Sequence, residues 1–477
     1  MVGAGFLVCA GSRVPETVPR ILVAAGILAI LCGVLPAAAA PLDETWSATF
    51  GGSLMENGYS VTPSGDGGYV IAGDARSSES VVSSDGWAIG TSSGGARLWD
   101  RRFGGSRYDS LNSVAAVSGG YVFAGTTLSF PSAGGQEAWL IRTGPDGTEL
   151  WNRTYGSPGT DLFQAVIQTT DGGYAAAGLT SAAGNGDAYL VKTSADGTEE
   201  WHASFGGTKS DKAMSLHQLS DGGYILAGTT YSMGENESNL YLVRTDSTGR
   251  LLWQKTYGHN RLNFGYDVDV LPDGGFAAVG YTDPYPSAGN RSVLAVRTAS
   301  DGSVVWETTP GSLRLISEGR SVAALDDGSL VITGGSQGLY LLGLAPGGTT
   351  VWETVIARSP NDWGMDIRPV AGSSGFVIGG LREQPGNNWD VYLVRADPVP
   401  GPQEPVILPG MTNPPTDPDG DGLYEDLNGN GRTDFADVSL FFAQMEWIAE
   451  NEPVPLFDLN GNGRIDFNDI VKQFEEF

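Results

Sequence analysis

The chain has almost no cysteine and little positive charge. Its two cysteines, Cys9 and Cys32, both lie among the first forty of 477 residues. Lys and Arg number 27 against 55 Asp and Glu, giving a formal net charge of −28. Such an acidic surface repels phosphate backbones, which excludes nucleic acid as a partner. Because 40% of the residues are hydrophobic, the chain can still bury a core, and we expect a globular protein.

The composition also lacks the features of a large helical protein. Glycine accounts for 70 residues and aromatic side chains for 10% of the chain. This combination is typical of many short strands joined by tight turns.

The first forty residues resemble a secretory leader. Arg13 and Arg20 precede an uncharged run from Ile21 to Val34, and small residues follow at Ala37–Ala40. The alternative, an uncleaved membrane anchor, needs about 20 apolar residues, more than this run provides. We therefore predict a signal peptide at 1–40 and a secreted protein at the cell surface, with no transmembrane segment after cleavage. The chain after residue 40 contains no cysteine, so it must be stabilised by packing or by bound metal and not by disulfides.

Seven tryptophans recur at intervals near fifty residues, and the order of motifs between them is constant. An aromatic-Gly corner is followed by an alternating segment, a DGGY-type turn, an apolar run, a variable stretch and a YLV-type run. Each repeat thus contains four short strands. The tryptophans are Trp46, Trp99, Trp151, Trp201, Trp253, Trp306 and Trp352.

Asp-Gly pairs close two hairpins in each repeat. Asp66-Gly67 and Asp171-Gly172 belong to the first kind, and Asp146-Gly147 and Asp196-Gly197 to the second. We expect primed turns, in which both central residues have positive φ. A four-stranded unit of this size cannot bury both faces alone, so the units must stack radially. The sequence predicts an all-β seven-bladed propeller over 41–398.

The ends of the repeat array predict how the ring closes. The last repeat lacks its Trp strand, whereas an unpartnered Trp strand, Thr45–Phe50, begins the array. We predict that this strand completes the seventh blade and removes both free edges.

The repeat resembles the DGGY/YLV/W propellers of secreted prokaryotic (archaeal-type) surface proteins, over roughly Glu44–Asp397. The resemblance implies a fold and little about chemistry. We interpret the periodic tryptophans as packing between blades rather than as a sugar-binding platform.

Acidic or amide side chains stand ten residues after most of these tryptophans. Two interpretations stay open, a turn side chain that bonds local backbone N–H groups and a ring of carboxylates that holds a cation or ligand. Repeat six is out of phase. The residues are Glu56, Asp109, Asp161, Asp211, Asn263, Glu318 and Asp362.

No enzyme motif in the propeller has convincing context. G-x-S-x-G occurs at Gly90–Gly94 and Gly334–Gly338, where chance matches are expected at this glycine content. The three histidines, His202, His217 and His259, lack metal-ligand spacing. Topology places the long, variable connections on the face opposite the Asp-Gly turns, and two of three N-x-S/T sequons, at Asn152, Asn236 and Asn290, lie in or beside them.

A proline-rich linker over 399–416 separates the propeller from a region at 417–477 that carries a duplicated twelve-residue motif. DLNGNGRTDFAD begins at Asp426 and DLNGNGRIDFND at Asp458. Oxygen ligands fall at the EF-hand positions one, three, five, seven, nine and twelve, and glycine falls at position six. These ligands are Asp426, Asn428, Asn430, Arg432, Asp434 and Asp437 in the first loop, and Asp458, Asn460, Asn462, Arg464, Asp466 and Asp469 in the second.

Apolar residues at helical spacing follow each loop, so the unit is a loop followed by a helix, twice. This pattern resembles the type I dockerin family, which implies two Ca²⁺ ions and a cohesin-like partner contacted through Phe435, Ala436, Phe467 and Asn468. An upstream segment with Asp417, Asp419 and Asp421 either binds a third ion or shields the first.

The leading hypothesis is a non-catalytic surface protein whose propeller is a binding scaffold, for a glycan or a surface protein, and whose C-terminal region docks to a partner with calcium. The alternative is a polysaccharide-active hydrolase or lyase with its site in the propeller, tethered by the dockerin-like domain.

Overall fold

The computed structural model describes residues 40–475, except 77–82, 131–134, 183, 284–290, 311–316, 336–337, 357–358, 360, 387, 400–406, 419–422, 452–453 and 461–463. The predicted signal peptide lies outside the described residues, except for Ala40. None of the helices in these ranges combines the length and apolarity required to cross a membrane.

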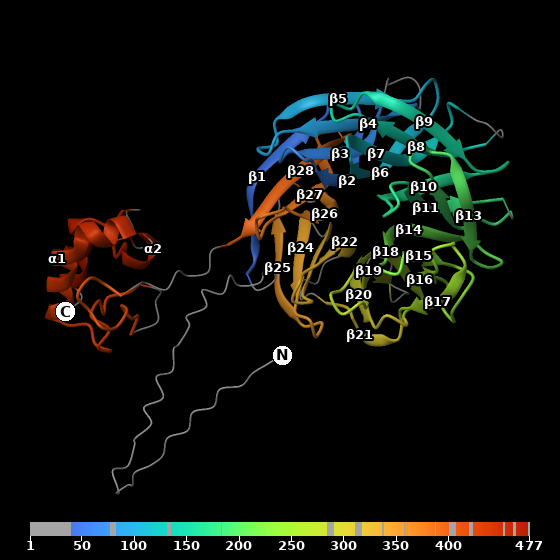
Figure 1. Cartoon of the computed structure of the whole chain (residues 1–477). Helices are drawn as coiled ribbons and strands as arrows, with labels where there is room; N and C mark the ends of the chain where they lie inside the picture. Colours follow the sequence, from blue (N-terminus) through green and yellow to red (C-terminus); the bar gives the residue numbers. More distant parts are fainter. Residues whose placement is uncertain are drawn as a thin grey trace, which may run out of the picture. The chain divides into compact units, whose positions relative to one another are not determined.

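The described strands form seven four-stranded antiparallel sheets arranged around an axis, which confirms the predicted seven-bladed propeller (Figure 1). The first four blades are β2 (Glu56–Pro63), β3 (Tyr69–Arg76), β4 (Ser84–Thr91) and β5 (Arg97–Phe103); β6 (Asp109–Val117), β7 (Gly120–Thr127), β8 (Glu137–Thr143) and β9 (Glu149–Tyr155); β10 (Asp161–Gln168), β11 (Tyr174–Thr180), β12 (Asp187–Thr193) and β13 (Glu199–Phe205); and β14 (Asp211–Gln218), β15 (Tyr224–Thr230), β16 (Asn239–Thr245) and β17 (Leu251–Tyr257).

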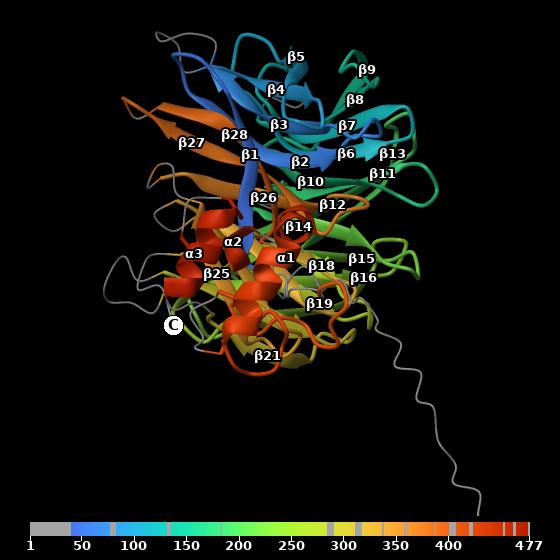
Figure 2. The same cartoon turned by 90° about the vertical axis from the view of Figure 1, so that its left-hand side faces the viewer.

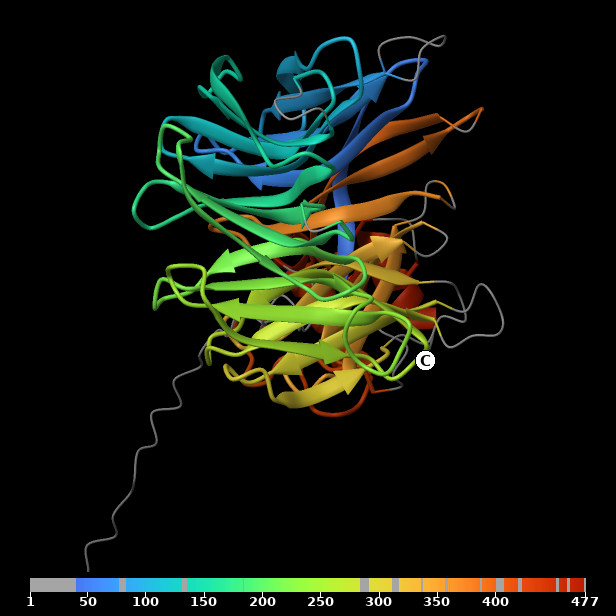
Figure 3. The same ribbon diagram turned by 90° about the vertical axis from the view of Figure 1, so that its right-hand side faces the viewer.

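The remaining three blades follow the same order from the axis outward. They are β18 (Leu262–Val270), β19 (Phe276–Asp283), β20 (Ser292–Thr298) and β21 (Val304–Thr308); β22 (Glu318–Ala324), β23 (Leu330–Gly335), β24 (Leu339–Leu344) and β25 (Thr350–Ile356); and β26 (Trp363–Pro369), β27 (Phe376–Gln384), β28 (Asn388–Pro398) and β1 (Leu42–Phe50). Seen from the side, successive strands of a blade are twisted relative to one another (Figure 3).

The Asp-Gly hairpins form where expected, but the two-residue primed turn is wrong. In the first hairpin the N–H of Gly67 donates to the carbonyl of Ser64, and that of Ser64 donates to Gly68. The loop therefore has three residues, and Gly67 occupies the left-handed position that follows the turn, with φ of 85°. The carboxylate of Asp66 accepts from the N–H of Gly68 at 3.3 Å, so Asp stabilises the loop through its side chain.

The periodic tryptophans pack between blades. Trp99 on β5 lies 6.1 Å, ring to ring, from Tyr121 at the start of β7 in the next blade. A Cβ on Gly147, in the Asp-Gly turn of that next blade, would lie 2.6 Å from the same indole. The contact recurs around the ring. The ring centroids of Trp46 and Tyr69, and those of Trp151 and Tyr174, are both 5.9 Å apart. The DGGY aromatic and the second Asp-Gly turn thus clamp the tryptophan of the preceding blade.

The ring closes as the sequence predicts. β1 pairs antiparallel with β28, from Leu42 opposite Pro398 to Phe50 opposite Val391 (Figure 2). Leu42 is 1% exposed and packs in the core between blades six and seven with Tyr392 and Val394. We call this junction, where β1, β28 and the start of β2 meet, the seam.

The C-terminal module, residues 407–475, has its own small core. It contains α1 (Phe435–Asn451), α2 (Val454–Phe457) and α3 (Phe467–Glu475). Phe441, Ile448 and Phe457 are buried together with Leu408, which lies inside the stretch predicted as linker.

Removing residues 41–50 should destroy cooperative folding of the propeller. The deletion exposes the edge of β28 and uncovers the apolar residues beneath β1, and an exposed edge strand recruits other chains. We expect aggregation or a broadened thermal transition, measured by light scattering and circular dichroism. Leu98→Ser, a change at an exposed apolar position on β5, is the control and should melt as the unmodified protein does. A truncated protein with an unchanged melting curve would contradict the role of the seam.

Candidate functional site

Each inner strand of the propeller carries a β-bulge at the same position. In β2 the register shifts between Gly58 and Ser60, so that Tyr59 is the extra residue. A bulge bends its strand and re-aims the next side chain. The residues after the seven bulges are Ser60, Ser113, Ala165, Ser215, Asp267, Ser321 and Asp366.

Five of these seven side chains accept a hydrogen bond from the backbone of the next blade, and together we call them the axial ring. The N–H that donates belongs in each case to the residue after the next blade's own ring position. The bonds run from Val61 to Asp366 at 2.9 Å, Val114 to Ser60 at 3.3 Å, Val166 to Ser113 at 3.2 Å, Val322 to Asp267 at 3.0 Å and Ile367 to Ser321 at 3.3 Å.

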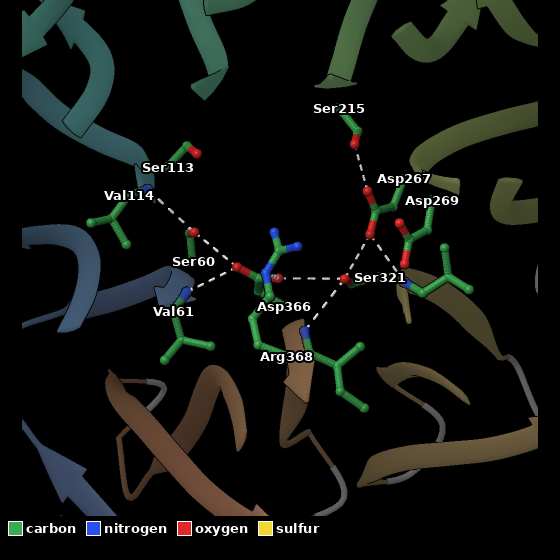
Figure 4. A network of polar contacts seen from close by, with 12 residues as sticks. Ser60, Val61, Ser113, Val114, Ser215, Asp267, Asp269, Ser321, Asp366 and Arg368 are labelled. Atoms are coloured by element: carbon green, nitrogen blue, oxygen red, sulfur yellow. Dashed lines mark hydrogen bonds and ion pairs between the residues drawn. The ribbon is translucent and has the colours of Figure 1, made fainter. Parts of the chain in front are cut away.

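The two carboxylates of the ring collect several donors each (Figure 4). Asp267 accepts from the hydroxyls of Ser215 at 2.6 Å and Ser321 at 2.7 Å, in addition to the N–H of Val322. Asp366 accepts from Ser60 at 2.8 Å. Each of these two side chains thus accepts more than one hydrogen bond from the adjoining blades.

A small axial cavity of about 130 Å³ lies within the ring. Arg368 projects into it from β26, and its Nε lies 3.0 Å from Asp366 Oδ1 (Figure 4). Burial raises the pKa of Asp366, although Arg368 and the N–H of Val61 oppose that effect. Asp366 in turn raises the pKa of Arg368. The cavity is lined mainly by polar side chains and has room for a few water molecules or a small polar group.

The axial ring is not among the sites predicted from the sequence, although the sequence carries a signal for it. The ring residue stands fourteen positions after the tryptophan in six repeats and fifteen in the repeat of Trp306 and Ser321. Three residue types at one phase, Ser, Asp and Ala, do not show a shared role until the bulge is known.

The acidic residues ten positions after the tryptophans serve their own blade-crossing loops. Asp109 accepts from the N–H of Gly105 at 2.9 Å and from Ser129 Oγ at 2.6 Å, and Asp211 repeats this with Gly207 at 2.8 Å and Ser232 at 2.6 Å. Their partners are local, as the first interpretation expects. Within the part of the chain that the structure describes, no group of three His, Cys, Asp or Glu side chains is placed to hold a metal ion.

The described residues of the remaining propeller motifs lie on strands, in hairpin turns and in exposed loops. Gly90–Gly94 lies at the β4–β5 hairpin rather than between a strand and a helix. His202 and His259 are exposed, and His217 lies 3.9 Å from Asp269. Asn152 is an exposed sequon on β9, whereas Asn236 donates its amide to Asn239 and Gly258, and Asn290 lies outside the described residues.

The described residues of the two duplicated loops share the same hydrogen bonds. The N–H of Asn428 donates to Asp437 and that of Asn460 to Asp469, both at 3.1 Å. Asp437 and Asp469 are fully buried. Burial raises the pKa of Asp437, and the N–H groups of Asp434 and Asn428 lower it. The two halves thus close position three onto position twelve in the same way.

The predicted ligands at position nine also begin the helices. Asp434 Oδ1 accepts from the N–H of Ala436, and Asp466 Oδ1 from that of Asn468, both at 2.8 Å. These are N-cap hydrogen bonds, at the start of α1 and of α3. In the first loop Asp426 accepts from Asn430 at 3.1 Å and Gly431 at 2.6 Å. Asn462, Asp419 and Asp421 lie outside the described residues, whereas Asp417 lies inside them.

An apolar groove of about 480 Å³ runs between α1 and α3. Four phenylalanines along it are 54–65% exposed. They form two crossed pairs, Phe435 with Phe474 at 6.4 Å and Phe442 with Phe467 at 6.2 Å. Phe435 and Phe467 hold the same place in their loops, so the groove is two-fold symmetric in its side chains. Of the predicted partner contacts, Phe435 and Phe467 line it.

No family model matches this chain, and no curated protein does. Solved structures that are similar to it include the Dos1 propeller, at TM-score 0.46 and 9% identity, covering 74% of this chain and 95% of that chain. Sqt1 from Chaetomium thermophilum matches at TM-score 0.45 and 10% identity, over 75% of this chain and 98% of its own. A protein of unknown function from Bacteroides caccae matches at 0.36 and 14%, over 63% and 93%. At these scores the fold rests on the strand pairing described above.

Asp267→Ala should destabilise the propeller far more than Ser113→Ala. The first change leaves two hydroxyls and two backbone N–H groups without their acceptor, and we expect a loss on the order of 3 kcal/mol. The second imitates Ala165, which the ring already contains, and should cost about 1 kcal/mol. Urea unfolding monitored by tryptophan fluorescence measures both. Equal, small losses would show that the ring does not hold the blades together.

Proposed function

We propose that this protein is a secreted surface protein whose propeller is a rigid binding scaffold and whose C-terminal module docks, with calcium, to a cohesin-like protein. The observation that carries the proposal is the exposed phenylalanine groove between α1 and α3, the two helices that follow the loops of EF-hand composition. Four large apolar side chains facing water are costly unless a partner covers them.

The donor set of the loops suits Ca²⁺. Each loop offers carboxylate and amide oxygens and one backbone carbonyl, all hard ligands, around a glycine-permitted turn. Gly431 has φ of 82°, a conformation that side chains other than glycine rarely adopt. Residues 411–477 carry 15 acidic and 3 basic side chains, and a bound cation would offset their mutual repulsion. Two ions, one in each loop, are expected.

The groove and the loops are adjacent in the sequence, since the first residue of each helix lines the groove. Phe435 and Phe467 come directly after the N-cap residues Asp434 and Asp466, which are also ligand positions. Occupying a loop therefore fixes the start of the helix on which the phenylalanine stands. Calcium would thus order the docking surface as well as the loop.

The propeller offers a different surface. Its long connections, such as the one between β15 and β16, share a face with the crossings between blades, whereas the Asp-Gly turns occupy the other face. Loops on a rigid scaffold are suited to recognition. A glycan or another surface protein is the proposed ligand of this face.

Calcium removal should unfold the C-terminal module and leave the propeller intact. The short helices are not stable alone, and a ligand bound only by the folded form stabilises it. We expect EGTA to abolish the helical circular dichroism signal and excess Ca²⁺ to restore it. Asp426→Ala with Asp458→Ala should prevent the recovery, whereas Glu446→Ala, an exposed acidic position on α1, should not. Identical spectra in EGTA and in Ca²⁺ would refute the calcium assignment.

Phe442→Ser and Phe474→Ser should each weaken docking by about thirtyfold or more, because a buried aromatic anchor contributes about 2 kcal/mol or more to binding. The measurement is calcium-dependent binding of the full chain to immobilised cohesin domains. Ala443→Ser, an exposed neighbour outside the groove, is the matched control. Binding that survives both phenylalanine changes would place the docking surface elsewhere.

A further inference from the structure

The seam holds a pair of buried carboxyl groups. Glu56 begins β2, the inner strand of blade one, and Asp390 lies on β28 of blade seven. Glu56 is 4% exposed and Asp390 is 8% exposed. The two side chains therefore meet where the ends of the propeller chain are joined.

An oxygen of each carboxyl group lies close to the Cα atom of the same glycine, Gly51. A Cβ placed on Gly51 would lie 2.0 Å from Asp390 Oδ1 and 3.0 Å from Glu56 Oε2. Nearby, the amide of Asn388 donates to the carbonyl of Ser53 at 2.6 Å, which adds a second polar link across the seam. Gly51 leaves open the space that the two oxygens border.

The hydrogen bonds at this point are incomplete. Glu56 Oε2 accepts from the N–H of Gly52 at 3.1 Å. Asp390 Oδ1 is buried and has no hydrogen-bond partner among the described residues. A buried carboxylate oxygen without a donor or a cation is costly. The orphaned oxygen, beside a second carboxyl group, points to a missing partner of positive charge.

Two other blade junctions solve the same problem with groups of their own. Between blades four and five the corresponding residues are Asn239 and Asn263, both buried and both neutral. Between blades five and six Glu318 is fully buried and forms ion pairs with Arg291 and Arg320. The seam has neither solution. Carboxyl groups also lie near each other at the junctions of Asp85 with Asp109 and of Asp187 with Asp211, and Asp161 Oδ1 in blade three is likewise buried without a hydrogen-bond partner among the described residues. The seam differs from these junctions because it joins the two ends of the propeller chain. Arg102 acts on Glu56 only from a distance and forms no ion pair with it in the described part of the chain.

We propose that Glu56 and Asp390 bind one divalent cation of the oxygen-preferring kind, Ca²⁺, as a staple across the seam. Gln384, whose side chain interacts with Asp390, can supply a carbonyl oxygen, and water completes the coordination. Such an ion joins the two terminal blades in a chain that has no cysteine after Cys32.

The competing arrangement is a proton shared by the two carboxyl groups. Burial raises the pKa of Glu56 and that of Asp390, and Asp390 raises the pKa of Glu56 further, while the N–H of Gly52 lowers it. A shared proton predicts a propeller that is more stable in mild acid and indifferent to Ca²⁺. A bound cation predicts instead that Ca²⁺ makes the propeller more stable at neutral pH.

The test uses the full chain carrying Asp426→Ala and Asp458→Ala, which disables the loops of the C-terminal module. Eleven of the 12 tryptophans lie in the propeller, so their fluorescence reports its thermal transition. At neutral pH, millimolar Ca²⁺ should raise the propeller melting temperature by several degrees. Adding Asp390→Asn should abolish that shift, whereas Glu318→Gln should lower the starting temperature and keep the shift.

Binding stoichiometry provides the second measurement. In equilibrium dialysis with Ca²⁺, the full chain should bind one ion more than its Asp390→Asn variant and the same number as its Glu318→Gln variant. The seam site would be overturned if Ca²⁺ left the melting temperature unchanged, or if it raised the melting temperature of the Asp390→Asn variant by as much as that of the protein without this change. Failure of the docking proposal leaves the result untouched, because the loops of the C-terminal module are disabled in the first experiment.

Discussion

The propeller depends on closing a ring of seven sheets without a covalent bond between its ends. The axial ring meets that requirement at its centre, where five of the seven bulges point an oxygen at the backbone of the next blade, as Asp366 does to Val61. Farther from the axis, the tryptophan on the outer strand of one blade lies against the Asp-Gly turn of its neighbour. Polar bonds fix the register of the blades, and apolar contacts supply most of the free energy.

The axial ring is also uneven, and this has physical consequences. The stretch from Asp267 through Ser321 and Asp366 to Ser60 is continuous and contains both carboxylates. Across the axis, Ala165 offers no acceptor to the N–H of Leu216. The side chains of the axial ring therefore bond blades five, six, seven and one to one another, whereas among the described residues they form no such bond between blades three and four. Local opening should favour the weak side.

Much of this architecture is readable in the sequence, because turns and packing residues recur at fixed phase. Local turn and packing preferences are enough to predict where Trp99, Asp146 and Gly147 lie in a blade. The bulges are not readable in this way, since a register shift such as that between Gly265 and Asp267 depends on the opposing strand. Helical spacing likewise identified an apolar face on α1 but could not separate buried Phe441 from exposed Phe442, because the division between core and groove is set by α3.

The pairing of β1 with β28 also determines the order of events during synthesis. β1 is the first strand of the propeller to be made and the last to find its partner, which lies about 350 residues later in the sequence. At ordinary elongation rates the wait is on the order of tens of seconds. During that time β1 carries unsatisfied edges and a bare apolar face beside nascent blades. A delay in translation, or slow pairing of β28 with β1, would therefore lengthen the period in which β1 can associate with other chains. That period ends when β1 is paired with β28 in the finished ring.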